Sequence, residues 1–127
     1  MSTELGILGL YGLFTILTIL VQATVAVGQV GLMTALYPRD NVKLAGVAAR
    51  LDRAQLNSVI ALALFAPGAL ILAHKGITTS TTVLAAEIFL VSRIIYVPAY
   101  AFGIPGLRTG VWTLGILATA WLYFAGL

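Results

Sequence analysis

Three polar side chains share one helical stripe at the start of the apolar segment 58–73. Arg50, Arg53 and Asn57 are spaced i, i+3, i+7, so on a helix they line one face. The two guanidinium groups are suited to bind a carboxylate or phosphate with paired hydrogen bonds. The amide must find a partner on another helix, in water or in a ligand, because lipid tails offer no hydrogen bonds. This stripe places fixed positive charge at the mouth of a membrane helix, where another polar group must meet it.

A second stripe with the same spacing lies in the segment 81–102. It consists of Arg93, Tyr96 and Tyr100. An arginine inside an apolar span is a functional hypothesis by default, and the matching period lets the two stripes face each other across one cleft. Alternatively, the two tyrosines are aromatic residues of the membrane interface.

Two further charged residues need an explanation. Arg108 stands at the entry to the last apolar segment, either as part of the same site or as a side chain that reaches out to lipid headgroups. Glu87 lies about 9 Å along a helix from Arg93, too far for a simple i, i+4 pair. Its expected partner is Gln22, Gln29 or a residue of another subunit.

The elements that carry these residues are predicted to be membrane helices. The chain has 127 residues, of which 61% are hydrophobic and 9% charged, with a mean hydropathy of +1.06. In soluble domains about 45–50% of the residues are apolar and about 25% are charged, so a water-soluble fold is excluded. We predict an all-α integral membrane bundle of four helices in a single domain, 1–127. The expected helices cover 5–36, 48–74, 81–102 and 109–124.

Several kinds of chemistry are not expected. The chain contains no cysteine, which excludes disulfides, thiolate metal sites and a cysteine nucleophile. His74 is the only histidine and has no carboxylate at ligand spacing, so we expect no metal. The net charge of +3 is small and scattered among loops. It indicates contact with anionic headgroups of a lipid bilayer and no nucleic-acid partner.

The loop charges predict an orientation. Basic residues gather in the first and third connections, and the positive-inside rule then places both connections in the cytoplasm. The opposite side offers Lys75. The residues that decide this are Arg39, Lys43, Arg50 and Arg53 in the first connection and Arg108 in the third. The first segment lacks a basic leader region, so we expect it to remain in the mature protein. The lack of a targeting segment suits a protein of a bacterial inner membrane, although a protein of the endoplasmic reticulum would have a similar sequence pattern.

The stripes resemble those of the MAPEG family, the membrane-associated proteins in eicosanoid and glutathione metabolism. The similarity rests on Arg53-Ala54-Gln55-Leu56-Asn57, on Arg93-Ile94-Ile95-Tyr96 with Tyr100, and on Arg108 at the start of the fourth helix. With the four-helix layout, it covers nearly the whole chain.

The resemblance implies a homotrimer that binds glutathione as co-substrate in clefts between subunits. In that family the residues matched by Arg53, Asn57 and Tyr96 contact glutathione, and the arginine matched by Arg108 stabilises its thiolate. Arg50, Arg53 and Arg93 are expected to meet the two carboxylates of glutathione. A lipophilic small molecule is expected to enter from the bilayer as the second substrate.

One position departs from the family's pattern and leaves the activity open. Ile60 stands where the pattern has a glutamate that holds the amino group of glutathione, and Ala61 follows where an aromatic residue is common. One hypothesis is a glutathione-dependent transferase or peroxidase acting on lipophilic electrophiles. The other is a non-catalytic accessory subunit or lipid-binding member of the same fold. A small transporter or channel is a third, but the intramembrane charges form no evident polar file.

Overall fold

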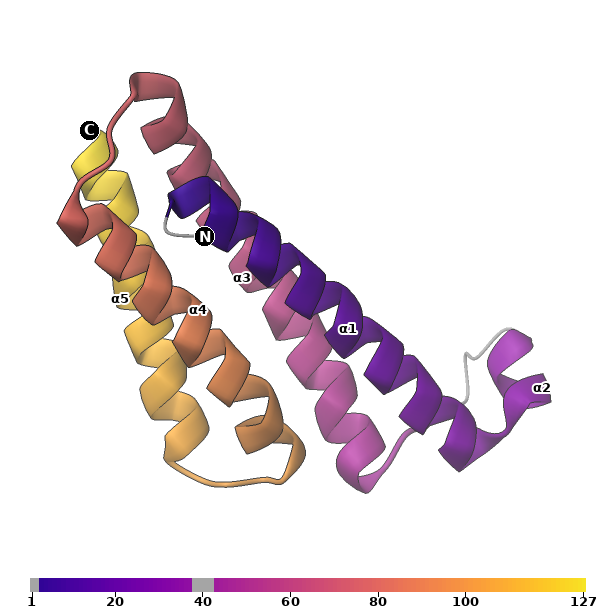
Figure 1. Cartoon of the computed structure of the whole chain (residues 1–127). Helices are drawn as coiled ribbons and strands as arrows, with labels where there is room; N and C mark the ends of the chain where they lie inside the picture. Colours follow the sequence, from indigo (N-terminus) through magenta and orange to yellow (C-terminus); the bar gives the residue numbers. More distant parts are fainter. Residues whose placement is uncertain (1–2, 38–42) are drawn as a thin grey trace.

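The computed structural model describes residues 3–37 and 43–127, which form helices joined by short connections (Figure 1). Four of these helices are long and apolar enough to cross a membrane, which confirms the prediction of an all-helical chain with four candidate spans. The chain is an integral membrane protein. The helices are α1 (Glu4–Val30), α2 (Leu32–Leu36), α3 (Gly46–Lys75), α4 (Ser80–Ala101) and α5 (Leu107–Gly126).

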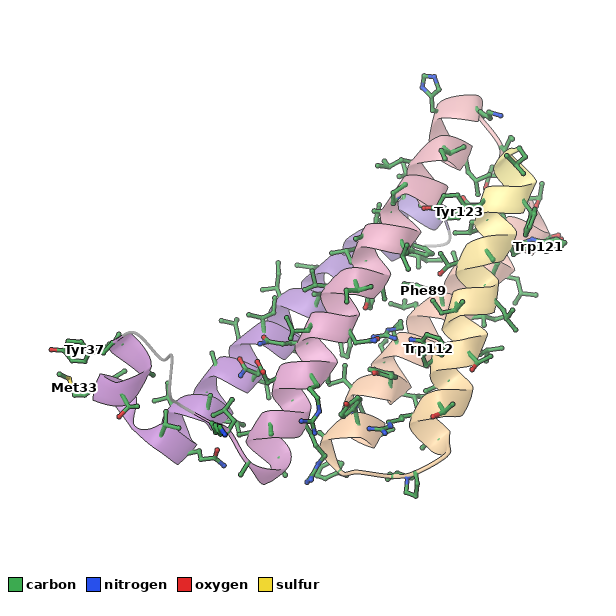
Figure 2. The ribbon with its side chains drawn as sticks, turned by 180° about the vertical axis from the view of Figure 1, so that it is seen from behind. Met33, Tyr37, Phe89, Trp112, Trp121 and Tyr123 are labelled. Atoms are coloured by element: carbon green, nitrogen blue, oxygen red, sulfur yellow. The ribbon has the colours of Figure 1, made fainter. Side chains whose placement is uncertain are left out.

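The prediction of one continuous helix over 5–36 was wrong at its C-terminal end. Gly31 has φ 89°, a conformation that side chains with a Cβ avoid, and it separates α1 from the five-residue helix α2. Figure 2 shows Met33 of α2 and Tyr37, which directly follows α2, pointing away from the rest of the bundle. Pro38 and Arg39, which follow α2 in the sequence, lie outside the described residues. The other three helices begin and end within two residues of their predicted bounds.

Local sequence explains where α3 stops and α4 starts. Gly76 takes the left-handed conformation with φ 68° and its N–H bonds back to the last turn of α3. Thr79 then caps α4, since its hydroxyl accepts from the Thr82 N–H while the Thr82 hydroxyl accepts from the Thr79 N–H. The glycine C-cap and the threonine cap together define the short connection between α3 and α4.

The helices pack as two antiparallel pairs, α1 with α3 and α4 with α5 (Figure 1). Helices α3 and α4 are central, because each contacts all three of the other long helices, whereas α1 and α5 do not touch within the described residues. We call the end of the bundle that holds Arg50, Arg53 and Arg108 the arginine end. The other end, which holds Lys75, is the Lys75 end.

A polar layer divides the packed interior into two parts. The larger core lies toward the Lys75 end, where the rings of Phe65 and Phe89 stack with centroids 4.1 Å apart. A smaller core around Leu51 and Tyr96 lies toward the arginine end. Between them the Tyr11 hydroxyl donates to the backbone carbonyl of Ser58 over 2.8 Å. This layer brings polar atoms to the depth at which the candidate site begins.

Candidate anion-binding site

An open pocket of about 320 Å³ lies at the arginine end, between α3, α4 and α5. It brings together four of the residues predicted from the two stripes and from Arg108. The described residues that line it are Asn57, Tyr96, Tyr100, Arg108, Thr109 and Trp112. The expectation that one cleft joins α3, α4 and the start of α5 therefore corresponds to a pocket in the structure.

Tyr100 holds two arginines in place beside the pocket. Its hydroxyl accepts a hydrogen bond of 3.0 Å from Nε of Arg53, and its ring faces the guanidinium of Arg108, with 4.4 Å from Cζ to the ring centroid. The ring of Tyr96 meets that of Tyr100 edge to face at 5.6 Å. Since a cation over an aromatic face is attracted to the ring, Tyr100 orients Arg108 toward the pocket that both line. Arg53 itself does not line the pocket but lies on its rim, exposed.

Arg93 lies behind the pocket wall. Its side chain is 2% exposed, and its Cζ is 4.0 Å from the centroid of the Tyr96 ring. One terminal nitrogen donates to the Ser58 hydroxyl at 3.5 Å, a long hydrogen bond. Nε of Arg93 is buried and has no hydrogen-bond partner among the described residues. The guanidinium therefore contributes positive charge from behind Tyr96 and does not touch the pocket itself.

A second buried atom also lacks a partner. Oδ1 of Asn57, on the pocket wall, accepts no hydrogen bond from the described residues. An unsatisfied buried polar atom costs roughly 1–3 kcal/mol, so a ligand that donates to this oxygen would gain that amount of affinity. The pocket thus offers both an unpartnered acceptor and a nearby cation.

Arg50 lies elsewhere than the prediction suggested. Its Nε donates to the backbone carbonyl of Ala101 over 2.8 Å, and its side chain runs close to Gly103, which has φ 67°. A cation at this place satisfies a free carbonyl at the C-terminus of α4 and interacts well with the helix dipole. Arg50 does not line the pocket; it fixes the start of the loop that leads to Arg108.

Sequence reasoning missed two residues that line the pocket, and Ser58, whose hydroxyl accepts a hydrogen bond from Arg93 in the polar layer. Thr109 and Trp112 follow Arg108 at i+1 and i+4, so the same helical spacing argument could have placed Trp112 on the face of Arg108. Ser58, which contacts Arg93, had no signal beyond its position after Asn57.

No carboxylate is among the described residues that line the pocket. Asp52, at the mouth of α3, accepts a hydrogen bond from Gln55 instead. Ile60 is 58% exposed and is not one of the residues that line the pocket, so the position at which the family's pattern has a glutamate lies outside the pocket of its own chain. No three histidine, aspartate or glutamate side chains cluster within residues 3–37 and 43–127 in a way that would hold a metal ion.

The fold and the pocket together define a class: a membrane protein with four candidate spanning helices, in which arginines and tyrosines from three helices surround an open pocket. The family model described as the MAPEG family matches residues 7–127. The chain therefore belongs to the MAPEG family, as its motifs predicted. Comparison with curated proteins and with solved structures gave no match.

Proposed function

We propose that this MAPEG protein binds glutathione at the arginine end and activates its thiol, with Arg108 as the catalytic residue. The observation that carries the proposal is that Arg108 lines the pocket, held by the Tyr100 ring, with no carboxylate among the described lining residues to neutralise it. A thiol with a pKa of about 8.5 is mostly protonated at neutral pH. A guanidinium beside the sulfur favours the nucleophilic thiolate.

The other pocket residues fit the anionic and amide parts of glutathione. Arg53 on the rim presents a guanidinium for a carboxylate, and Asn57 presents an unpartnered amide oxygen for a peptide N–H. Tyr96 forms part of the pocket wall. Arg93 adds positive charge from behind Tyr96, and Arg50 holds the loop before Arg108. The amino group of glutathione fits less well than its carboxylates. It is positively charged, and no carboxylate is among the described residues that line the pocket.

Trp112 gives the pocket an apolar wall, which supports a lipophilic electrophile as the second substrate. The proposed reaction is attack of the thiolate on that electrophile, or reduction of a lipid peroxide. We further propose a homotrimer in a bacterial inner membrane with the arginine end in the cytoplasm. The exposure of Ile60 leaves this face of α3 open to a neighbouring subunit, as a trimer would require.

A second candidate function is a non-catalytic lipid-binding or accessory protein. Ile60 favours it, because a glutamate that would bind the amino group of glutathione is replaced by an apolar side chain. In this case the same arginines would bind the carboxylate of a fatty acid or the phosphate of a lipid. The cation at Arg108 would then fix the headgroup and activate no thiol.

One titration distinguishes the two functions. Glutathione is added to the purified protein in detergent while the ultraviolet absorbance of the thiolate is followed. The first function predicts a saturable signal that Arg108→Gln abolishes. Lys43→Gln, which removes one positive charge from an exposed side chain outside the pocket, should keep it. A folded wild-type protein without any signal would contradict thiol activation, and a lipid anion extracted from the purified sample would then support the second function.

A further inference from the structure

A long apolar groove follows the exposed side of the α4–α5 hairpin and shares no residue with the arginine-end pocket. It consists of two adjoining hollows of about 330 and 310 Å³, which have Leu84, Ile88 and Leu114 in common. Thr81 and Trp121 lie at its end toward the Lys75 end of the bundle, and Ile95 and Val111 at the other. We call it the α4–α5 groove.

One side chain in this groove does not suit hydrocarbon. Glu87 is exposed and lines the groove beside aliphatic residues such as Leu84 and Val91, which are both 55% exposed. It lies seven residues after the start of α4, about 10 Å along the helix. An ionised carboxylate at this depth costs several kcal/mol unless a proton or a cation neutralises it.

The chain itself provides no cation for Glu87 among the described residues. Of its expected partners, Gln29 uses its amide to bond both backbone groups of Ala45, and Gln22 is buried in α1. Arg93 is on the same helix but buried on the other side, against Tyr96. The carboxylate therefore faces outward from the hairpin.

The described basic side chains of a second copy are not placed to neutralise Glu87 either. The exposed basic side chains that the structure describes lie toward the arginine end or at the Lys75 end. They are Lys43, Arg53, His74, Lys75 and Arg108. Arg53, which is seven residues inside α3, bonds Tyr100, about 20 Å along α4 from Glu87. None of these basic side chains lies at the depth of Glu87, so charge complementarity favours a small cationic ligand over another subunit.

We propose that the α4–α5 groove binds a single-chain amphiphile with a protonated amine head. The ammonium group pairs with Glu87, and the alkyl chain lies along the aliphatic wall formed by residues such as Ile88 and Leu114. Lipid tails are as apolar as this wall, so the chain alone gives little preference over bulk lipid. The selectivity comes from the ion pair, which is strengthened by the low dielectric constant of its surroundings. This inference is independent of the function proposed for Arg108.

The chain carries its own reporter for the test. It has two tryptophans, Trp112 in the arginine-end pocket and Trp121 in the groove, and Figure 2 shows them apart along α5. Trp112→Phe leaves Trp121 as the single tryptophan, which is excited selectively at wavelengths that tyrosine does not absorb. This protein, in phosphatidylcholine nanodiscs, is titrated with a long-chain alkylamine brominated on its chain, and separately with the alcohol of the same chain. Bromine quenches tryptophan only at short range.

The amine should quench Trp121 saturably and at a several-fold lower concentration than the alcohol. Glu87→Gln should abolish this difference, and Glu87→Asp should retain it, which separates the charge from folding. Asp52→Asn is the matched control, because it removes a carboxylate that hydrogen-bonds Gln55 outside the groove. Equal quenching by amine and alcohol, or an unchanged preference in Glu87→Gln, would overturn the proposal. Efficient cross-linking of two copies through Glu87→Cys would also overturn it, by showing that the groove is a subunit interface.

Discussion

The guanidinium of Arg93 stacks on the ring of Tyr96 at 4.0 Å, but only Tyr96 lines the pocket. Removing a charged arginine from water costs several kcal/mol, whereas a desolvated cation–π contact stabilises it by only about 2 kcal/mol. No carboxylate pairs with Arg93 among the described residues, and its Nε lacks a hydrogen-bond partner. Arg93 therefore carries a buried positive charge that an anion in the neighbouring pocket would partly offset.

The first prediction follows from that imbalance. Arg93→Met keeps an unbranched side chain of similar length and removes the charge, so the ligand-free protein should become more stable by about 1–2 kcal/mol. The same variant should lose most of the stabilisation that glutathione gives to the wild-type protein. Thermal unfolding in detergent, with and without glutathione, measures both effects. A ligand-free variant that unfolds at a lower temperature and keeps the full glutathione effect would show that Arg93 is structural only.

Tyr100 permits a second prediction, because its ring and its hydroxyl hold different arginines. Tyr100→Phe removes the hydrogen bond from Arg53 and leaves the ring beneath Arg108. Thiolate formation should therefore persist, while the binding free energy of glutathione should fall by up to about 3 kcal/mol. Tyr100→Leu removes both contacts and should also reduce the thiolate signal at saturating glutathione. Binding constants and the saturated absorbance separate the two effects. Equal losses in both variants would mean that the ring does not position Arg108.

Most of the fold could be predicted because membrane helices are recognisable from the length and composition of their apolar segments. The bounds of α3, α4 and α5 were close, since a glycine C-cap and a threonine N-cap mark the connection between α3 and α4. The break at Gly31 was missed. A glycine between apolar residues is compatible with a continuous membrane helix, and only its backbone conformation reveals that the chain turns there.

The site was predictable in its residue types but not in the direction of each side chain. Helical spacing correctly brought Asn57, Tyr96 and Tyr100 to one pocket with Arg108. The same spacing could not show that Arg50 turns to the backbone at Ala101. Whether an arginine binds a ligand or caps a helix depends on the neighbouring helix and the loop after it, which a single-helix pattern does not contain.

A third prediction separates these two roles of Arg50. If its main task is the hydrogen bond to the Ala101 carbonyl, Arg50→Lys and Arg50→Gln should each lower stability, by about 1.5–3 kcal/mol, because neither places a donor as the guanidinium Nε does. If instead its charge binds the ligand, Arg50→Lys should retain affinity and stability. Thermal unfolding and glutathione titration of the two variants decide between these outcomes.

A fourth prediction concerns glycines at helix contacts. A Cβ at Gly115 would lie 3.6 Å from Arg93 Cδ, an ordinary contact, so Gly115→Ala should be tolerated and gain up to about 1 kcal/mol from helix propensity. A Cβ at Gly68 would lie 3.2 Å from the Tyr123 ring, whose hydroxyl donates to the Leu64 carbonyl. Gly68→Ala must displace this ring, so it should gain less than Gly115→Ala or lose stability. Thermal unfolding of the two variants side by side tests the contrast.

The last prediction concerns the Lys75 end, where Glu4 is only 5% exposed. Its carboxylate accepts hydrogen bonds from the hydroxyls of Thr78 and Thr82, next to the N-terminus of α4. A carboxylate at a helix N-terminus is favoured by the helix dipole, and charge-assisted hydrogen bonds are the stronger kind. Glu4 thus ties the start of α1 to the start of α4.

Glu4→Gln should therefore lower the stability by about 1–3 kcal/mol while the thiolate signal at the arginine end stays unchanged. Thr82→Val should lower it at least as much, because the Thr82 hydroxyl also accepts from the Thr79 N–H in the cap of α4. Thr78→Val, which removes a donor outside the cap, should have the smallest effect. Thermal unfolding gives this order of the three variants. A Glu4→Gln protein as stable as the wild type would mean that the negative charge is unnecessary and that packing alone joins the two helix ends.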